Sequence, residues 1–91
     1  MKTVTIVGVG LIGGSFALGL RKQGFQGRLI GVSSPATVAQ ALGRGVINEA
    51  LSLEQAVPQS DLVYLAQPIG RILDILPVVA RLAPPDRKSV V

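Results

Sequence analysis

A glycine string near the amino-terminus constrains this chain more than any other feature. Gly8, Gly10 and Gly13 have the spacing G-x-G-x-x-G. Before the string, residues 2–8 form a nearly continuous apolar run, which suits a strand covered on both faces. After it, the apolar positions of residues 11–23 have helical spacing. A strand that turns through such glycines into a helix, in a βαβ unit, is typical of a dinucleotide-binding fold.

Each glycine has an expected task in that fold. Gly8 makes the tight turn, Gly10 lets the backbone approach a pyrophosphate, and Gly13 lets the helix lie close to the strand. We expect N–H groups at the helix start, near Leu11 and Ile12, to hold phosphate oxygens with help from the helix dipole. The alternative is a tight turn with a packing glycine and no ligand, which gives no reason for glycine at all three positions.

Strands and helices alternate along the whole chain. The expected fold class is therefore α/β: a Rossmann-like parallel sheet with helices on both faces and right-handed crossovers. Residues 1–91 are expected to form one NAD(P)-binding domain that stops within its fifth strand. The expected strands span 2–8, 28–32, 45–50, 61–66 and 87–91, and helices begin at 11, 35, 53 and 67.

Local signals predict where several helices begin and end. Gly24 predicts a left-handed end to the first helix, with an apolar residue after it. Ser34, directly before a proline, predicts the start of the second helix. Ser52, with Gln three residues later, has the form of a capping box that opens a short helix, which Pro58 is expected to end.

Apolar spacing predicts which face each long helix buries. The predicted buried positions of the first helix are Ile12, Phe16, Gly19 and Leu20. Those of the last helix are Ile69, Ile72, Leu73 and Leu76. Pro77 is expected to break or kink the last helix, or to open a second one.

The turn after the second strand bears on the choice of cofactor. Twenty residues after Gly13, where an NAD site usually carries Asp or Glu, the chain has Ser33, followed by Ser34. An acidic side chain would repel a 2′-phosphate, whereas a serine hydroxyl can donate to it, so the turn favours NADP while NAD stays possible. The alternative is that both serines serve only the turn and the helix cap. No arginine follows Ser33, and Arg44 lies roughly 15 Å further along the predicted helix, so the phosphate clamp is weak.

The composition excludes several kinds of site. The chain contains neither Cys nor His, so we expect no metal site and no histidine base. No apolar run reaches the roughly 18 residues of a membrane span, and the first residues do not resemble a signal peptide. We therefore expect no membrane partner and a cytoplasmic location.

The charge distribution bears on the partner. The net charge is +4, and the basic residues are scattered, without aromatic residues placed among them to stack on bases. We expect no nucleic-acid partner, and a phosphate-bearing small ligand suits this charge equally well.

Four segments resemble the amino-terminal domain of the prephenate dehydrogenase family, which includes the arogenate dehydrogenases: VTIVGVGLIGGSFALGLRKQG, LIGVSS, GVINEA and DLVYLAQPI. The resemblance implies an NAD(P)-dependent oxidoreductase of tyrosine biosynthesis. Such an enzyme decarboxylates prephenate or arogenate oxidatively and passes a hydride to NADP or NAD.

The resemblance implies cofactor contacts at three turns. The matching residues are Gly8, Gly10, Leu11, Ile12 and Gly13 in the phosphate-binding turn, Ser33 and Ser34 in the ribose-selecting turn, and Ala66, Gln67 and Pro68 in the turn after the fourth strand. Gln67 stands where the family commonly has Thr, which leaves its side-chain role open. The family's catalytic His follows the point where this chain stops, so no catalytic residue is assigned. The chain is expected to bind the cofactor without completing the reaction, because the substrate contacts belong to a further domain.

Two other interpretations stay open. The chain is a stand-alone, non-catalytic nucleotide-binding module from a truncated gene, or the first half of another oxidoreductase, such as an F420-dependent NADP reductase or a hydroxy-acid dehydrogenase. Self-association is also expected, because only 15% of the residues are charged and the strand begun at 87–91 would expose an unpaired edge.

Overall fold

The computed structural model describes residues 2–83 and 89–90. Its strands are β1 (Thr3–Val7), β2 (Arg28–Val32), β3 (Glu49–Ala50), β4 (Leu62–Leu65) and β5 (Ser89–Val90). Its helices are α1 (Leu11–Lys22), α2 (Pro35–Gly43), α3 (Leu53–Ala56) and α4 (Ile69–Leu82), and a 3-10 turn, η1 (Val57–Gln59), follows α3. The expected alternation of strands and helices is confirmed; the rest of the expected fifth strand lies outside the described residues.

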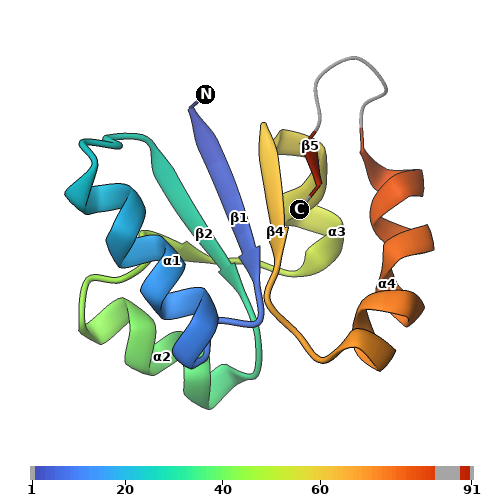
Figure 1. Cartoon of the computed structure of the whole chain (residues 1–91), viewed down its shortest axis with the longest axis horizontal. Helices are drawn as coiled ribbons and strands as arrows, with labels where there is room; N and C mark the ends of the chain where they lie inside the picture. The colour runs from blue at the N-terminus through green and yellow to red at the C-terminus, as the bar shows by residue number, and fades with distance from the viewer. Residues whose placement is uncertain (1, 84–88, 91) are drawn as a thin grey trace.

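The strands form one parallel sheet in the order β3-β2-β1-β4-β5. From β1 the chain builds outward to β2 and β3, and it then returns to the other side of β1 to add β4 and β5. In such doubly wound sheets, ligands bind outside the carboxyl ends of the strands at the point where the order reverses. These ends lie at the bottom of Figure 1, where α1, α2 and α4 begin.

Successive residues of β1 enter two separate apolar layers. Val4 and Ile6 pack in one cluster with Ala17 of α1, on the side that α2 also covers. Val7 packs in the other cluster with Val79 of α4, on the side that α3 covers. Helices therefore lie on both faces of the sheet (Figure 1), which confirms the predicted fold class.

The buried face of α1 differs from the prediction. Of the four predicted residues, Ile12 is 67% exposed and Gly19 is also exposed, while the other two are partly buried. The helix instead buries Gly13 and Ala17. The cause is the contact of Gly13 with the turn at Gly8, which fixes how α1 is rotated about its axis.

The buried face of α4 also differs from the prediction, since only Ile72 of the four predicted residues packs against the core. The predicted residues that lie exposed form one stripe, called here the α4 stripe: Ile69, Leu73 and Leu76. The packed side centres on Val79, with Ile72 and Ile75 partly buried beside it. The helix carries apolar residues on both sides, so its spacing alone fits either orientation. Pro77 lies inside α4, which continues through it to Leu82.

The helix ends predicted from Gly24, Ser34 and Ser52 are confirmed. Gly24 has a φ of 94°, and the N–H of Phe25 donates to the carbonyl of Leu20 at 3.0 Å, which closes α1 in a Schellman motif. The hydroxyl oxygen of Ser34 accepts a hydrogen bond from the first turn of α2. Ser52 forms both halves of the predicted capping box at α3.

A buried hydroxyl pair ties η1 to β1. Pro58 lies within η1 rather than after the helix, so the chain turns once more before β4 than predicted. The turn ends at Ser60, whose hydroxyl donates to the carbonyl of Ala56 at 2.6 Å and also hydrogen-bonds Thr5. Both hydroxyl residues are fully buried, so this contact is a fixed point under the centre of the sheet.

Candidate functional site

Three strand ends meet at Gly8. Its N–H donates to the carbonyl of Val32 at the end of β2, at 2.8 Å, and the N–H of Ala66 after β4 donates to the carbonyl of Val7, also at 2.8 Å. Gly8 has a φ of 91°, and a Cβ built on it would lie 2.4 Å from the carbonyl oxygen of Ala66. Only glycine fits here, and the turns after β1, β2 and β4 are held together around it.

Gly13 brings α1 down onto the same turn. A Cβ on Gly13 would lie 2.2 Å from the carbonyl oxygen of Gly8 and 3.0 Å from a methyl carbon of Ile6. The helix therefore starts in direct contact with the backbone of the turn, as predicted for the third glycine. The first helical hydrogen bond runs from the N–H of Gly14 to the carbonyl of Gly10, at 2.8 Å.

Gly10 has a different environment. Nothing in the described part of the chain lies within 4 Å of a Cβ built there, so protein packing does not require glycine. Beside it, the N–H groups of the first helical turn have no acceptor within the helix, and the side chains of Leu11 and Ile12 are 89% and 67% exposed. This opening, lined by donors at the positive end of a helix dipole, suits a phosphate group.

A hollow of about 360 Å³ lies beside the turn, between the ends of β1 and β2 and the start of α4. Its polar residues are Ser33, Ser34, Gln67 and Arg71, and its apolar wall includes Val32, Leu53 and Ile75. No Asp or Glu is among the described residues that line it. The structure thus brings together three of the predicted residues and adds one, Arg71, that the sequence analysis missed.

The two serines of the hollow are not equivalent. The hydroxyl of Ser34 serves the α2 cap: it accepts from the N–H of Thr37 at 3.4 Å and hydrogen-bonds the Thr37 hydroxyl at 2.8 Å. The hydroxyl of Ser33 makes no hydrogen bond within the described residues, and the residue is half-buried. Ser33 is therefore the serine whose hydroxyl is left for a ligand.

The turn after β4 places its residues at different depths. Ala66 and Gln67 are half-buried beside Gly8, whereas Pro68 is exposed and precedes the first residue of α4. Among the described residues no side chain caps α4, and the N-terminal turn of this helix, which carries Arg71, also lies at the carboxyl edge.

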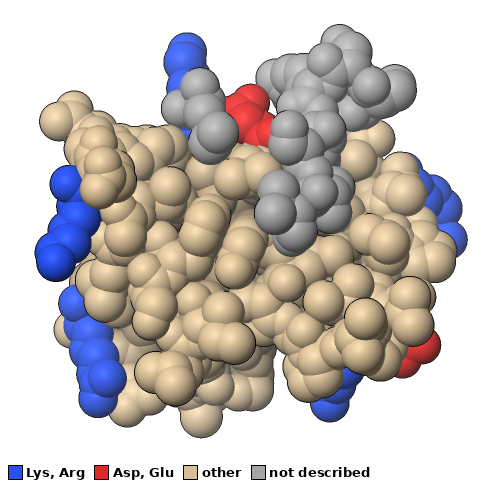
Figure 2. All heavy atoms as spheres, in the orientation of Figure 1, with Lys and Arg blue, Asp and Glu red and all other residues tan. Residues whose placement is uncertain are grey.

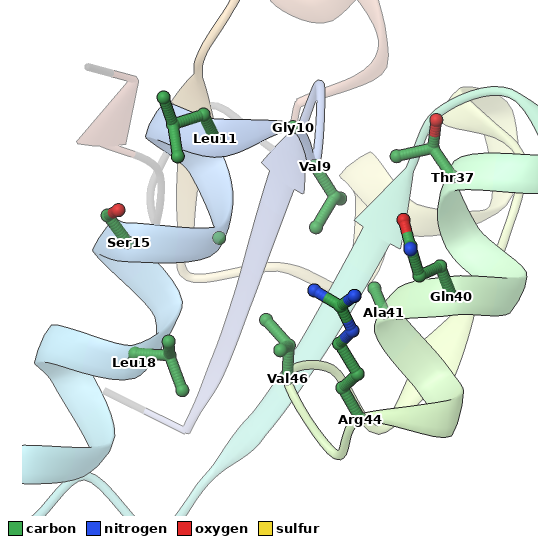
Figure 3. A pocket seen from close by; sticks show the side chains of 11 residues that line it. Val9, Gly10, Leu11, Ser15, Leu18, Thr37, Gln40, Ala41, Arg44 and Val46 are labelled. Carbon is green, nitrogen blue, oxygen red and sulfur yellow. The ribbon is translucent and has the colours of Figure 1, made fainter.

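A second hollow, of about 440 Å³, lies on the other side of the turn between α1 and α2 (Figure 3). Leu11, Ser15 and Leu18 of α1 face Gln40 of α2 across it, together with Arg44, the residue that follows α2. Arg44 therefore lies on the α1 side of α2 and does not line the hollow that contains Ser33, which agrees with its expected distance from the serine turn.

Two other arginines are engaged in structural contacts. Arg28 pairs with Glu49 at 2.7 Å; this hydrogen bond lowers the pKa of the Glu49 carboxyl, against an opposing effect of desolvation. Arg21 donates to the carbonyls of Phe25 and Gly27, both at 2.8 Å. On the face seen in Figure 2, basic side chains are spread around the rim and do not form one patch.

Within residues 2–83 and 89–90, no cluster of three acidic, His or Cys side chains could hold a metal ion. No helix in this part of the chain is long and apolar enough to cross a membrane.

The family model described as NADP oxidoreductase, coenzyme F420-dependent, matches residues 3–91. The chain belongs to this family. A curated relative, a prephenate dehydrogenase of Lactococcus lactis, is 34% identical to this chain over 80 residues. The match covers 88% of the chain and 23% of the relative.

Several solved structures are similar over 99% of the chain, including two dehydrogenases at more than 30% identity. One is a prephenate dehydrogenase from A. aeolicus in complex with hydroxyphenyl propionate and NAD+, with 33% identity and a TM-score of 0.89. The other is the Synechocystis arogenate dehydrogenase, with 32% identity and a TM-score of 0.83. The resemblance to prephenate and arogenate dehydrogenases is thereby confirmed. The chain spans 32% of each of these structures and 23% of the curated relative.

Proposed function

We propose that this chain is the cofactor-binding part of a prephenate or arogenate dehydrogenase, and that it binds NADP(H) in preference to NAD(H). The observation that carries the proposal is the turn at Gly10: a position where glycine is not needed for packing, next to helical N–H groups without intrahelical acceptors. The similarity to two dehydrogenases over nearly the whole chain supports the choice of family.

The residues present fit a nicotinamide dinucleotide. Gly8 and Gly13 hold the turn, and the N–H groups of Leu11, Ile12 and Gly13 would bind the pyrophosphate past Gly10. The remaining proposed contacts are Ser33 and Ser34 at the ribose and Ala66, Gln67 and Pro68 along the turn after β4. When bound, the nicotinamide ring accepts the hydride; the chain's residues bind and orient the dinucleotide.

The preference for NADP rests on what lines the serine hollow. An NAD site usually holds the ribose diol with a carboxylate, and no carboxylate is among the described residues that line this hollow. Titration calorimetry of the chain with NADPH and with NADH tests the preference. Equal or tighter binding of NADH would contradict the NADP assignment, and no binding of either would contradict the cofactor site.

We also propose that the chain alone does not turn over prephenate or arogenate. The sequence contains no His, the side chain that most often acts as a general base, so these 91 residues do not supply a histidine base. Mixing the chain with NADP and either substrate should produce no absorbance from NADPH. Production of NADPH would show that these residues carry a complete active site.

The family description makes an F420-dependent NADP reductase the second candidate. A longer form of the protein distinguishes the two: oxidation of prephenate or arogenate supports the first, and hydride exchange between NADPH and coenzyme F420 supports the second. A stand-alone, non-catalytic nucleotide-binding module would show neither reaction. The cytoplasmic location expected from the sequence stays a prediction.

Self-association is proposed on the α4 stripe. Ile69, Leu73 and Leu76 recur at intervals of four and three residues, so they share one side of α4, and they are 76%, 66% and 40% exposed. A second copy of the chain is the proposed occupant, since matching apolar stripes are self-complementary. Sedimentation at micromolar concentration should show a dimer or larger species; a monomer throughout that range would contradict this proposal.

A further inference from the structure

We infer that Arg71 is the residue that selects NADP, because its guanidinium supplies the positive charge for a 2′-phosphate that the serine turn itself lacks. This inference rests on the proposed cofactor site. Arg71 lies in the first turns of α4, and it lines the same hollow as Ser33 and Ser34, although it lies 38 positions after Ser33 in the sequence.

The sheet order produces this juxtaposition. β1 lies between β2 and β4, so the turn after β2 and the helix after β4 begin on either side of the Gly8 turn. The helices that follow β2 and β4, α2 and α4, both start at the carboxyl edge of the sheet, and the hollow lies between their starts. A side chain from the first turns of α4 can therefore reach a group bound at the serine turn. Arg44, at the far end of α2, lines the other hollow instead.

Arg71 has no competing structural task. Its guanidinium makes no hydrogen bond or ion pair within the described residues, and its side chain is exposed. Arg28 and Arg21, by contrast, are held by Glu49 and by backbone carbonyls. An unpaired guanidinium beside a hydroxyl and without a neighbouring carboxylate in the lining is suited to a phosphate dianion, which it can bind through two parallel hydrogen bonds.

The rest of the hollow fits the adenosine that carries this phosphate. Val32, Leu53 and Ile75 form an apolar wall against which a flat base can lie, while Gln67 adds a hydrogen-bonding side chain. The Ser33 hydroxyl makes no hydrogen bond to the described residues, so it can donate to the phosphate alongside Arg71. The proposed clamp thus consists of one hydroxyl and one guanidinium from opposite sides of the hollow.

The test measures the adenosine half of the cofactor separately. The dissociation constants of 2′,5′-ADP and 5′-AMP, which differ by the 2′-phosphate, are measured for the 91-residue chain and its variants by calorimetry. Loss of a hydrogen bond to a charged group should weaken 2′,5′-ADP binding by about tenfold or more in Arg71→Gln and leave 5′-AMP binding unchanged. Arg71→Lys should keep part of the preference, because it keeps the charge and loses the planar fork.

Arg81→Gln is the matched control. Arg81 lies in the last turn of the same helix and does not line the hollow, so both affinities should stay at their wild-type values. Thermal melts should show all variants folded, since neither arginine side chain makes a hydrogen bond or ion pair within the described residues.

The possible outcomes separate the two proposals. If the unmodified chain prefers 2′,5′-ADP and Arg71→Gln keeps that preference, Arg71 is not the clamp and the cofactor site stands. An equal loss for both nucleotides also overturns the clamp, and it assigns the guanidinium to the adenine ring. If the unmodified chain binds neither nucleotide nor NADPH, the proposed function fails together with this inference.

Discussion

Gly10 and Gly13 lie three residues apart in one turn, and the structure predicts opposite consequences when each is replaced. In Gly13→Ala, the added methyl carbon would meet the carbonyl oxygen of Gly8 at 2.2 Å, a backbone atom that cannot rotate away. Overpacking of this kind costs about 3 kcal/mol. The gain from replacing a helical glycine returns about 1 kcal/mol. The net loss of about 2 kcal/mol should lower the melting temperature by roughly 8–16 °C in a domain of this size.

Gly10→Val should leave stability nearly unchanged and remove cofactor binding. No described residue lies within 4 Å of a Cβ at this position, so the first carbon of the new side chain does not clash with the protein. It projects into the opening where the pyrophosphate is proposed to lie. The free energy of unfolding should change by less than about 1 kcal/mol, because a poorer helix cap and a less flexible unfolded chain have opposing effects.

The assays are thermal denaturation followed by circular dichroism and titration with NADPH. Gly19→Ala is the control, since it adds a methyl group to an exposed position of α1, where no other described residue lies within 4 Å. It should raise stability by up to about 1 kcal/mol without changing NADPH affinity. A Gly13→Ala variant as stable as the unmodified chain would refute the close approach of α1 to the turn. A Gly10→Val variant that binds NADPH normally would refute the phosphate site.

Three further outcomes are expected. Ser60→Ala should lower the free energy of unfolding by about 1–3 kcal/mol in urea denaturation, because the buried hydroxyl of Thr5 then loses this partner. Thr5→Val should lower the free energy of unfolding by less, because the Ser60 hydroxyl keeps its hydrogen bond to the carbonyl of Ala56. Glu49→Gln should be slightly less stable than the unmodified chain at pH 7 and equally stable at low pH. The contact with Arg28 lowers the pKa of Glu49, so the contact stabilises the folded state above the ordinary carboxyl pKa. This stabilisation is lost as the pH falls through the lowered pKa. A difference that persists in acid would contradict this assignment. Leu73→Gln should shift the sedimentation of any dimer toward the monomer, and an unchanged profile would exclude the α4 stripe as the interface.

The fold and the glycine turn could be predicted because their signals are local. The spacing of Gly8, Gly10 and Gly13, the caps at Ser34 and Ser52 and the β-branched runs each act over a few residues, and the structure forms the corresponding turns, caps and strands. Such signals depend on backbone dihedral angles and hydrogen bonds between near neighbours in the chain, which the sequence specifies directly.

The rotation of the helices was decided by the tertiary structure. α4 has apolar residues on two sides, so periodicity alone cannot tell that the side of Val79 packs and the side of Leu73 is exposed. The sequence also did not predict that Arg71 lines the same hollow as Ser33. The two residues come together only because β4 pairs with β1 on the side opposite β2. The sequence by itself determined which segments become strands, helices and the glycine turn. Only the packed sheet decided which distant side chains share the hollow, since that depends on strand order and on close contacts between elements far apart in the chain.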